Sequence, residues 1–66
     1  MTYKEAVKKL RLKMLMTQEE FAKLLDVSFA TINRWETGKY VQTIKAKRKL
    51  QPYFKKYNIT IDEEWL

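Results

Sequence analysis

Side chains able to recognise nucleic-acid bases are grouped between positions 28 and 34. Phe29 and Ala30 are apolar and can pack on the methyl groups of thymine in a DNA groove. Asn33 matches adenine or a phosphate, and the two-pronged guanidinium of Arg34 matches a guanine edge or a phosphate. The residues expected to contact bases are Ser28, Phe29, Ala30, Asn33 and Arg34. The alternatives are that Phe29 is a surface or core aromatic and that Arg34 is a solvated cation.

The chain lacks the side chains on which most catalytic and metal sites depend. It has no histidine and no cysteine, which removes the commonest general base, the commonest transition-metal ligand and every thiolate. No pair of carboxylates is expected to face a cleft. The sequence therefore predicts a protein that is not an enzyme and that uses no cofactor and no metal.

Positive charge is concentrated in the second half of the chain. The net charge is +6, and the stretch 39–56 holds seven basic residues and no acid. Such a stretch suits a phosphate backbone, although a solvated helix face explains it equally well from charge alone. No apolar run reaches the roughly 20 residues that span a bilayer, and the N-terminus lacks the apolar core of a signal peptide. We therefore expect a cytoplasmic protein without a membrane segment.

The elements that must position these side chains are helices. Apolar residues recur three and four positions apart, and the single glycine and single proline argue against a turn-rich β fold. The spacing predicts helices over about 2–14, 18–25 and 28–37. A fourth begins at the N-cap Thr43, and Pro52 either kinks it or ends it and starts a short helix that Asn58 terminates. With a further turn from Thr60, this gives a compact all-α domain of four to five helices over residues 1–66.

Capping signals and apolar stripes fix how these helices begin and which sides they bury. Thr2 with Glu5 and Thr17 with Glu20 have the spacing of a capping box, and Ser28 is the N-cap of the third helix. The residues expected to point inward are Tyr3, Ala6, Val7, Leu10, Met14, Phe21, Ala22, Leu24, Leu25, Ile32, Trp35, Ala46, Leu50, Tyr53 or Phe54, and Tyr57.

The segment from position 17 carries a recognisable pattern. The run TQEEFAKLLDVSFATINRWETGK resembles the helix-turn-helix of phage lambda-type repressors, Cro proteins and the related Xre-type bacterial regulators. The matching positions are Thr17, Gln18, Ala22, Val27, Ser28, Ile32, Trp35, Glu36 and Gly38. The resemblance implies a lambda-repressor-like DNA-binding domain whose helix-turn-helix unit spans residues 17–38 and whose second helix in that unit enters the major groove.

Glu36 is an acid near the expected end of a helix, where the helix dipole disfavours it, so it should have a cationic partner. In the family an arginine of the first helix pairs with this glutamate, and Arg11 stands at the matching position. The resemblance therefore implies a largely buried structural ion pair between Arg11 and Glu36.

The chain departs from the family at two glycine positions. Asp26 at the corner tolerates a left-handed backbone, whereas Leu15 after the first helix implies a different turn or backbone strain.

Residues that flank the base-reading set should contact the DNA backbone. In the family the start of the second helix points at a phosphate, and the residues after the third helix are placed for the other side of the groove. The expected phosphate contacts are Thr17, Gln18, Thr31, Thr37, Lys39 and Tyr40. The cations of the fourth helix either add such contacts or contribute only a long-range field; they are Lys45, Lys47, Arg48 and Lys49.

Together these features predict sequence-specific binding of double-stranded DNA in the major groove by a transcriptional regulator of the repressor type. The alternative is an antitoxin or anti-repressor module on the same fold, in which Phe29 and Tyr40 contact a protein partner. One module buries too little surface for tight DNA binding, so a homodimer through the C-terminal segment is expected. The apolar residues of that segment, including Trp65 and Leu66, could instead complete the monomer core. No small-molecule substrate is expected.

Overall fold

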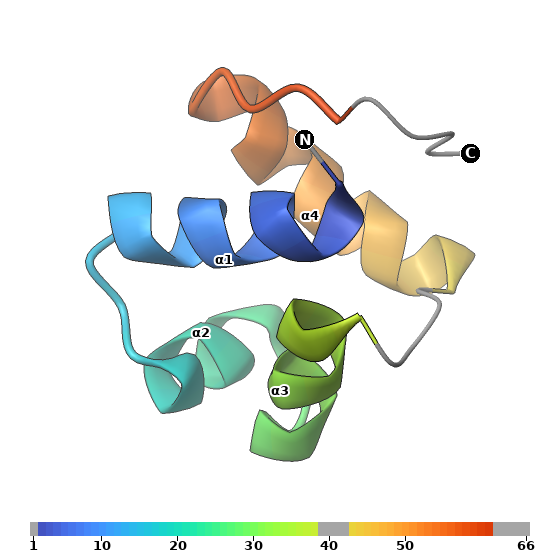
Figure 1. Cartoon of the computed structure of the whole chain (residues 1–66). Coiled ribbons are helices and arrows are strands. Elements are labelled where there is room, and N and C mark those ends of the chain that lie inside the picture. Colours follow the sequence, from blue (N-terminus) through green and yellow to red (C-terminus); the bar gives the residue numbers. More distant parts are fainter. Residues whose placement is uncertain (1, 39–42, 62–66) are drawn as a thin grey trace.

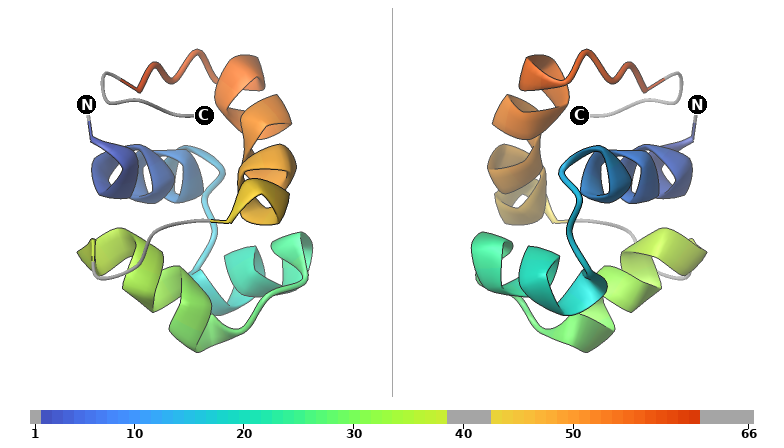
Figure 2. Two further views of the ribbon diagram at one scale, coloured as in Figure 1. Left: turned by 90° about the vertical axis from the view of Figure 1, so that its right-hand side faces the viewer. Right: turned by 90° about the vertical axis from the view of Figure 1, so that its left-hand side faces the viewer.

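Four α-helices form the regular structure in a computed structural model that describes residues 2–38 and 43–61. The helices are α1 (Tyr3–Lys13), α2 (Gln18–Leu25), α3 (Phe29–Thr37) and α4 (Ile44–Lys56). Helix α1 crosses the middle of the molecule in Figure 1, with α2 and α3 on one side of it, and Figure 2 shows α4 standing beside α1. Contacts join α3 to both α1 and α2, and α4 to α1. The predicted all-α class is confirmed.

Each helix begins at a serine or threonine whose side-chain oxygen accepts a hydrogen bond from a backbone N–H three residues later; these N-caps are Thr2, Thr17, Ser28 and Thr43. Both predicted capping boxes are present. The carboxylate of Glu5 accepts from the backbone N–H of Thr2 at 2.9 Å, and that of Glu20 accepts from the backbone N–H of Thr17 at 2.9 Å. These contacts satisfy amides that the first turn of a helix leaves free, so the helix starts are fixed locally.

The core draws side chains from all four helices. Its buried residues are Tyr3, Ala6, Val7, Leu10, Phe21, Ala22, Leu25, Ile32, Trp35, Ala46, Leu50, Phe54 and Ile59. Of the two residues of α4 predicted as alternatives for the core, Phe54 is buried, while Tyr53 is partly buried against the same cluster. Phe54 meets the ring of Tyr3 edge-on with 6.3 Å between the centroids, which fastens the end of α4 to the start of α1.

The inward placement predicted for Leu24 is wrong, because this side chain is 41% exposed. Phe21, Ala22 and Leu25 define the buried stripe of α2. At 3.6 residues per turn, Leu24 lies about 100° around the helix from the centre of that stripe. The apolar pattern over eight residues is too short to separate the buried side of α2 from its shoulder.

Four of the described residues adopt a left-handed backbone, and each one ends a helical segment. Asp26 (φ 56°) and Gly38 (φ 75°) are the C-caps of α2 and α3, as their residue types predict. Asn58 (φ 56°) follows α4, which confirms it as the residue that ends that segment. Leu15 also has φ 58°, so of the two alternatives for the corner after α1 the structure shows backbone strain.

Helix α4 continues through Pro52, so the alternative in which the helix ends there is excluded. Leu50 and Phe54 are buried on either side of the proline, and this burial outweighs the loss of one backbone hydrogen bond. After α4 the segment 59–61 is not helical. The rest of the turn expected from Thr60, including Trp65 and Leu66, lies outside the described residues.

Candidate nucleic-acid interface

Helix α3 separates a buried side from an exposed side. Ile32 and Trp35 face the core, with 0% and 1% of their surface exposed. The opposite side carries four exposed residues, which are Phe29, Ala30, Asn33 and Arg34. Figure 1 shows the start of α3 at the end of the molecule farthest from the segment 59–61, where no other described helix covers it. The base-contact set thus shares one open surface, and the alternative in which Phe29 belongs to the core is contradicted.

Phe29 and Arg34 are the two large side chains on this surface. The ring of Phe29 is 50% exposed in the first turn of α3. The guanidinium of Arg34 has no ion-pair partner within the described residues. An apolar ring and an unpaired planar cation less than two turns apart are able to contact a thymine methyl group and a guanine edge in one groove.

The hydroxyl groups at the start of α3 bond to each other and to the helix. Ser28 Oγ accepts from the backbone N–H of Thr31 at 3.1 Å, and the two hydroxyl oxygens lie 2.8 Å apart. Ser28 is exposed and Thr31 is half-buried. At the other end of α3, the exposed Thr37 donates its hydroxyl to the carbonyl of Arg34 at 3.2 Å. Lys39 and Tyr40, expected to contact phosphates, lie outside the described residues.

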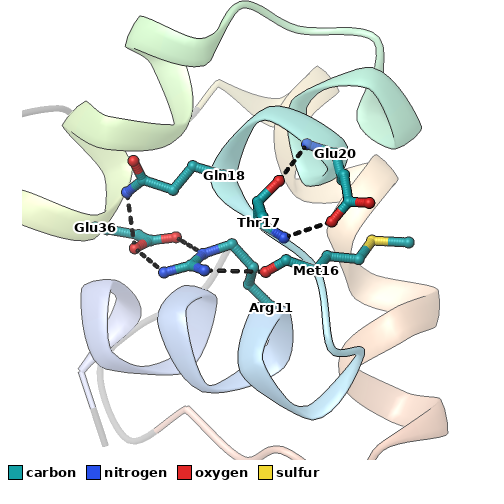
Figure 3. A network of polar contacts seen from close by, with 6 residues as sticks. All are labelled: Arg11, Met16, Thr17, Gln18, Glu20 and Glu36. Carbon is teal, nitrogen blue, oxygen red and sulfur yellow. Dashed lines mark hydrogen bonds and ion pairs between the residues drawn. The ribbon is translucent and has the colours of Figure 1, made fainter.

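The side of α3 away from this surface ends in the ion pair that the resemblance implied. Arg11 Nε donates to Glu36 Oε2 at 2.6 Å and Arg11 Nη2 donates to Glu36 Oε1 at 3.0 Å, a two-pronged contact (Figure 3). The two side chains are only 12% and 6% exposed. Hydrogen bonding to Glu36 raises the pKa of Arg11 above its ordinary value, so the guanidinium stays charged. The pair joins the end of α3 to α1.

Two further contacts make this ion pair the junction of three helices. Arg11 Nη1 donates to the carbonyl of Met16 at 3.0 Å, which ties down the segment between α1 and α2 (Figure 3). The amide nitrogen of Gln18 donates to Glu36 Oε1 at 3.1 Å. Gln18 was expected to contact a phosphate, and the structure shows that its amide nitrogen already bonds to the buried carboxylate. The exposed Thr17 beside it caps α2 with its hydroxyl.

The corner between α2 and α3 is held from α4 by a contact that the sequence did not indicate. Lys49 Nζ donates to the carbonyl of Leu25 at 2.8 Å, at the C-terminal end of α2. A cation there satisfies a free carbonyl and complements the helix dipole. The backbone N–H of Val27 bonds to the carbonyl of Ala22 at 3.0 Å and closes the turn. Lys49 is one of the four cations expected to contact phosphates or to contribute a long-range electrostatic field, and in the structure it stabilises the corner between α2 and α3.

Comparison with known proteins identifies one family. A family model for helix-turn-helix proteins, HTH_3, matches residues 7–63. This range holds most of α1 and all of α2, α3 and α4. Searches of curated proteins and of solved structures give no match.

Proposed function

The chain belongs to the helix-turn-helix family of DNA-binding proteins, and on that basis we propose that it is a transcriptional regulator of the repressor type. In this proposal α3 enters the major groove of double-stranded DNA and reads a specific sequence. The protein acts by binding, without catalysis, and works in the cytoplasm.

The observation that carries the proposal is the exposed side of α3. Phe29 is half exposed although the same helix buries Ile32 and Trp35 completely or nearly so. Burying the ring of Phe29 against thymine methyl groups would recover apolar surface that the free protein leaves in water. Asn33 and Arg34, on the same side, supply hydrogen bonds to base edges. Ser28 and Ala30 complete the proposed base contacts.

Phosphate contacts are proposed at both margins of this surface. The start of α2 presents Thr17, and the positive end of the helix dipole there favours an anion. Gln18 supports this end of α2 through its bond to Glu36 and can meet a phosphate with its remaining groups. The remaining proposed phosphate contacts are Thr31, Thr37, Lys39 and Tyr40. The net charge of +6 favours such contacts.

Selection of bound duplexes from a random pool tests the proposal. We expect an enriched palindrome with half-sites about one helical turn apart, because a homodimer presents two α3 helices. The affinity for that site should fall steeply with salt concentration. Failure to enrich any sequence, with salt-insensitive capture of a protein instead, would contradict DNA reading and favour the antitoxin or anti-repressor alternative, for which Phe29 would be a contact residue.

A further inference from the structure

Leu15 is energetically unfavourable in the free protein for two reasons. Its backbone is left-handed at φ 58°, a conformation that an L-residue with a branched side chain rarely adopts. Its side chain is 90% exposed, the largest exposed fraction among the exposed large apolar residues. Neither local geometry nor packing within the described chain therefore explains a leucine at this position. A strained, exposed apolar residue points to a use outside the monomer.

Leu15 follows in the chain directly after an apolar and basic surface of α1. The backbone N–H of Leu15 bonds to the carbonyl of Leu12 at 3.1 Å, and Leu12 is itself 53% exposed. Leu12 lines an open groove of about 460 Å³ with Glu5, Lys8, Lys9 and Lys13. We call Lys8, Lys9, Leu12, Lys13 and Leu15 the α1 surface. Glu5 keeps its negative charge in the capping box with Thr2, and the three lysines outnumber it, so the lining of the groove is positively charged overall.

The chain contains a segment with the complementary chemistry. Residues 62–66 read DEEWL, which is three consecutive acids followed by two large apolar residues. The acids match the three lysines, and Trp65 and Leu66 match the leucines of the α1 surface. We propose that the α1 surface binds the segment Asp62–Leu66 of a second copy of this chain. The inference gives a contact for the homodimer in the proposed function, although the association itself needs no DNA.

The path of the described chain favours a second copy over the same copy. After α4, the segment 59–61 runs over α1 toward the N-terminal end of that helix in Figures 1 and 2. Leu12 lies near the opposite, C-terminal end of α1, and Leu15 follows that end. A reciprocal exchange between two copies forms the contact twice around a two-fold axis, as in most protein dimers.

The decisive variant is Leu15→Gly in the full chain. Glycine relieves the left-handed backbone, so the thermal midpoint of the monomer should rise by about 4 °C. The same change removes an apolar anchor, so the dimerisation constant from sedimentation equilibrium should fall at least about tenfold. Opposite shifts in stability and association cannot arise from misfolding. Leu24→Ala is the matched control, since Leu24 is 41% exposed on α2 and should leave dimerisation unchanged.

A charge exchange tests whether the contact runs between copies. Lys9→Glu and Glu63→Lys each place like charges together, so each variant alone should dimerise several-fold more weakly than the parent. In an equimolar mixture of the two variants, one contact pairs the reversed charges and the other is unchanged. The mixture should therefore form a heterodimer about as tight as the parent dimer.

Three results would overturn the inference: a parent chain that stays monomeric to about 1 mM, Leu15→Gly protein that dimerises as tightly as the parent, or a mixture no tighter than its components. Failure of this dimer contact can be distinguished from failure of the proposed DNA binding. A dimer that binds no duplex contradicts DNA reading alone, and a monomer that binds a specific half-site contradicts the dimer contact alone.

Discussion

The two sides of α3 use one short helix for opposite purposes. The inner side buries Ile32 and Trp35 and ends in Glu36, whose carboxylate bonds to Arg11 and Gln18. The outer side leaves its residues, Phe29 among them, exposed and makes few contacts within the chain.

The family pattern and the proposed specificity therefore lie on different residues. The matched positions Ile32, Trp35 and Glu36 hold the helix against α1 and α2, and they are the ones by which the family is recognised. Phe29 and Arg34 lie outside that pattern, so they can differ between relatives without loss of the fold. Changes on the inner side should therefore alter stability first, and changes on the outer side should alter DNA preference first.

Replacing Trp35 should have the largest effect on the inner side. Trp35→Ala empties a nearly fully buried site, and large-to-small core substitutions of an aromatic cost about 4 kcal/mol of unfolding free energy. Denaturant unfolding followed by circular dichroism measures this loss. Asn33→Ala, on the outer side of the same helix, is the control and should change stability by less than about 0.5 kcal/mol. Similar losses for both variants would erase the distinction between the two sides.

Breaking the buried ion pair should cause the second largest loss of unfolding free energy. Glu36→Ala leaves the guanidinium of Arg11 buried without its carboxylate, which should cost about 3 kcal/mol of unfolding free energy. The double variant Arg11→Met, Glu36→Leu replaces both charges by apolar groups and should lose clearly less than either single variant. A double variant that loses the sum of the two single losses would show that the pair acts as two independent residues.

On the outer side, Arg34→Ala should leave stability unchanged and weaken binding to the selected duplex by about 1–3 kcal/mol. Fluorescence anisotropy with the selected duplex and with a random duplex separates two roles for Arg34. A loss confined to the selected duplex fits a base contact, because a base contact carries sequence information. Equal losses on both duplexes would reassign Arg34 to a phosphate.

The smallest effect on stability should come from protonating Glu20 in the capping box of α2 at acid pH. Hydrogen bonds from Thr17 lower the pKa of Glu20 below its ordinary value of 4.5. The folded state therefore binds the proton less readily than the unfolded state, so this stabilisation is present above pH 4.5 and is lost as the pH falls through the lowered pKa. Thermal unfolding between pH 6 and pH 3 should show a smaller decline for Glu20→Gln than for the parent. A steeper decline for the variant would contradict the lowered pKa of Glu20 in the folded state.

The sequence predicts features that depend on neighbouring residues and misses those that depend on distant ones. Thr17 and Glu20 form the predicted capping box because three residues of helix bring them together. Asp26 adopts the left-handed turn because its short polar side chain tolerates it. The contact of Lys49 with Leu25 spans 24 positions and depends on how α4 packs, which no local pattern encodes.

The ion pair of Arg11 with Glu36 is also distant in sequence, and it was foreseen only through the family resemblance. The role of Gln18 shows the limit of that route, because the resemblance implied a phosphate contact and the structure adds a bond to Glu36. Propensity alone leaves the path of the chain through Pro52 open, whereas in the structure the helix continues and residues on both sides of the proline are buried.

Phe29→Ala tests most directly whether the outer side of α3 reads DNA while contributing little to the fold. The measurement is the ratio of the dissociation constants for the random and the selected duplex, taken together with the thermal midpoint of the same protein. We predict that the ratio falls about tenfold and that the midpoint shifts by less than about 2 °C. An unchanged ratio, or a midpoint lowered by about 10 °C or more, would contradict the account and make Phe29 a structural residue.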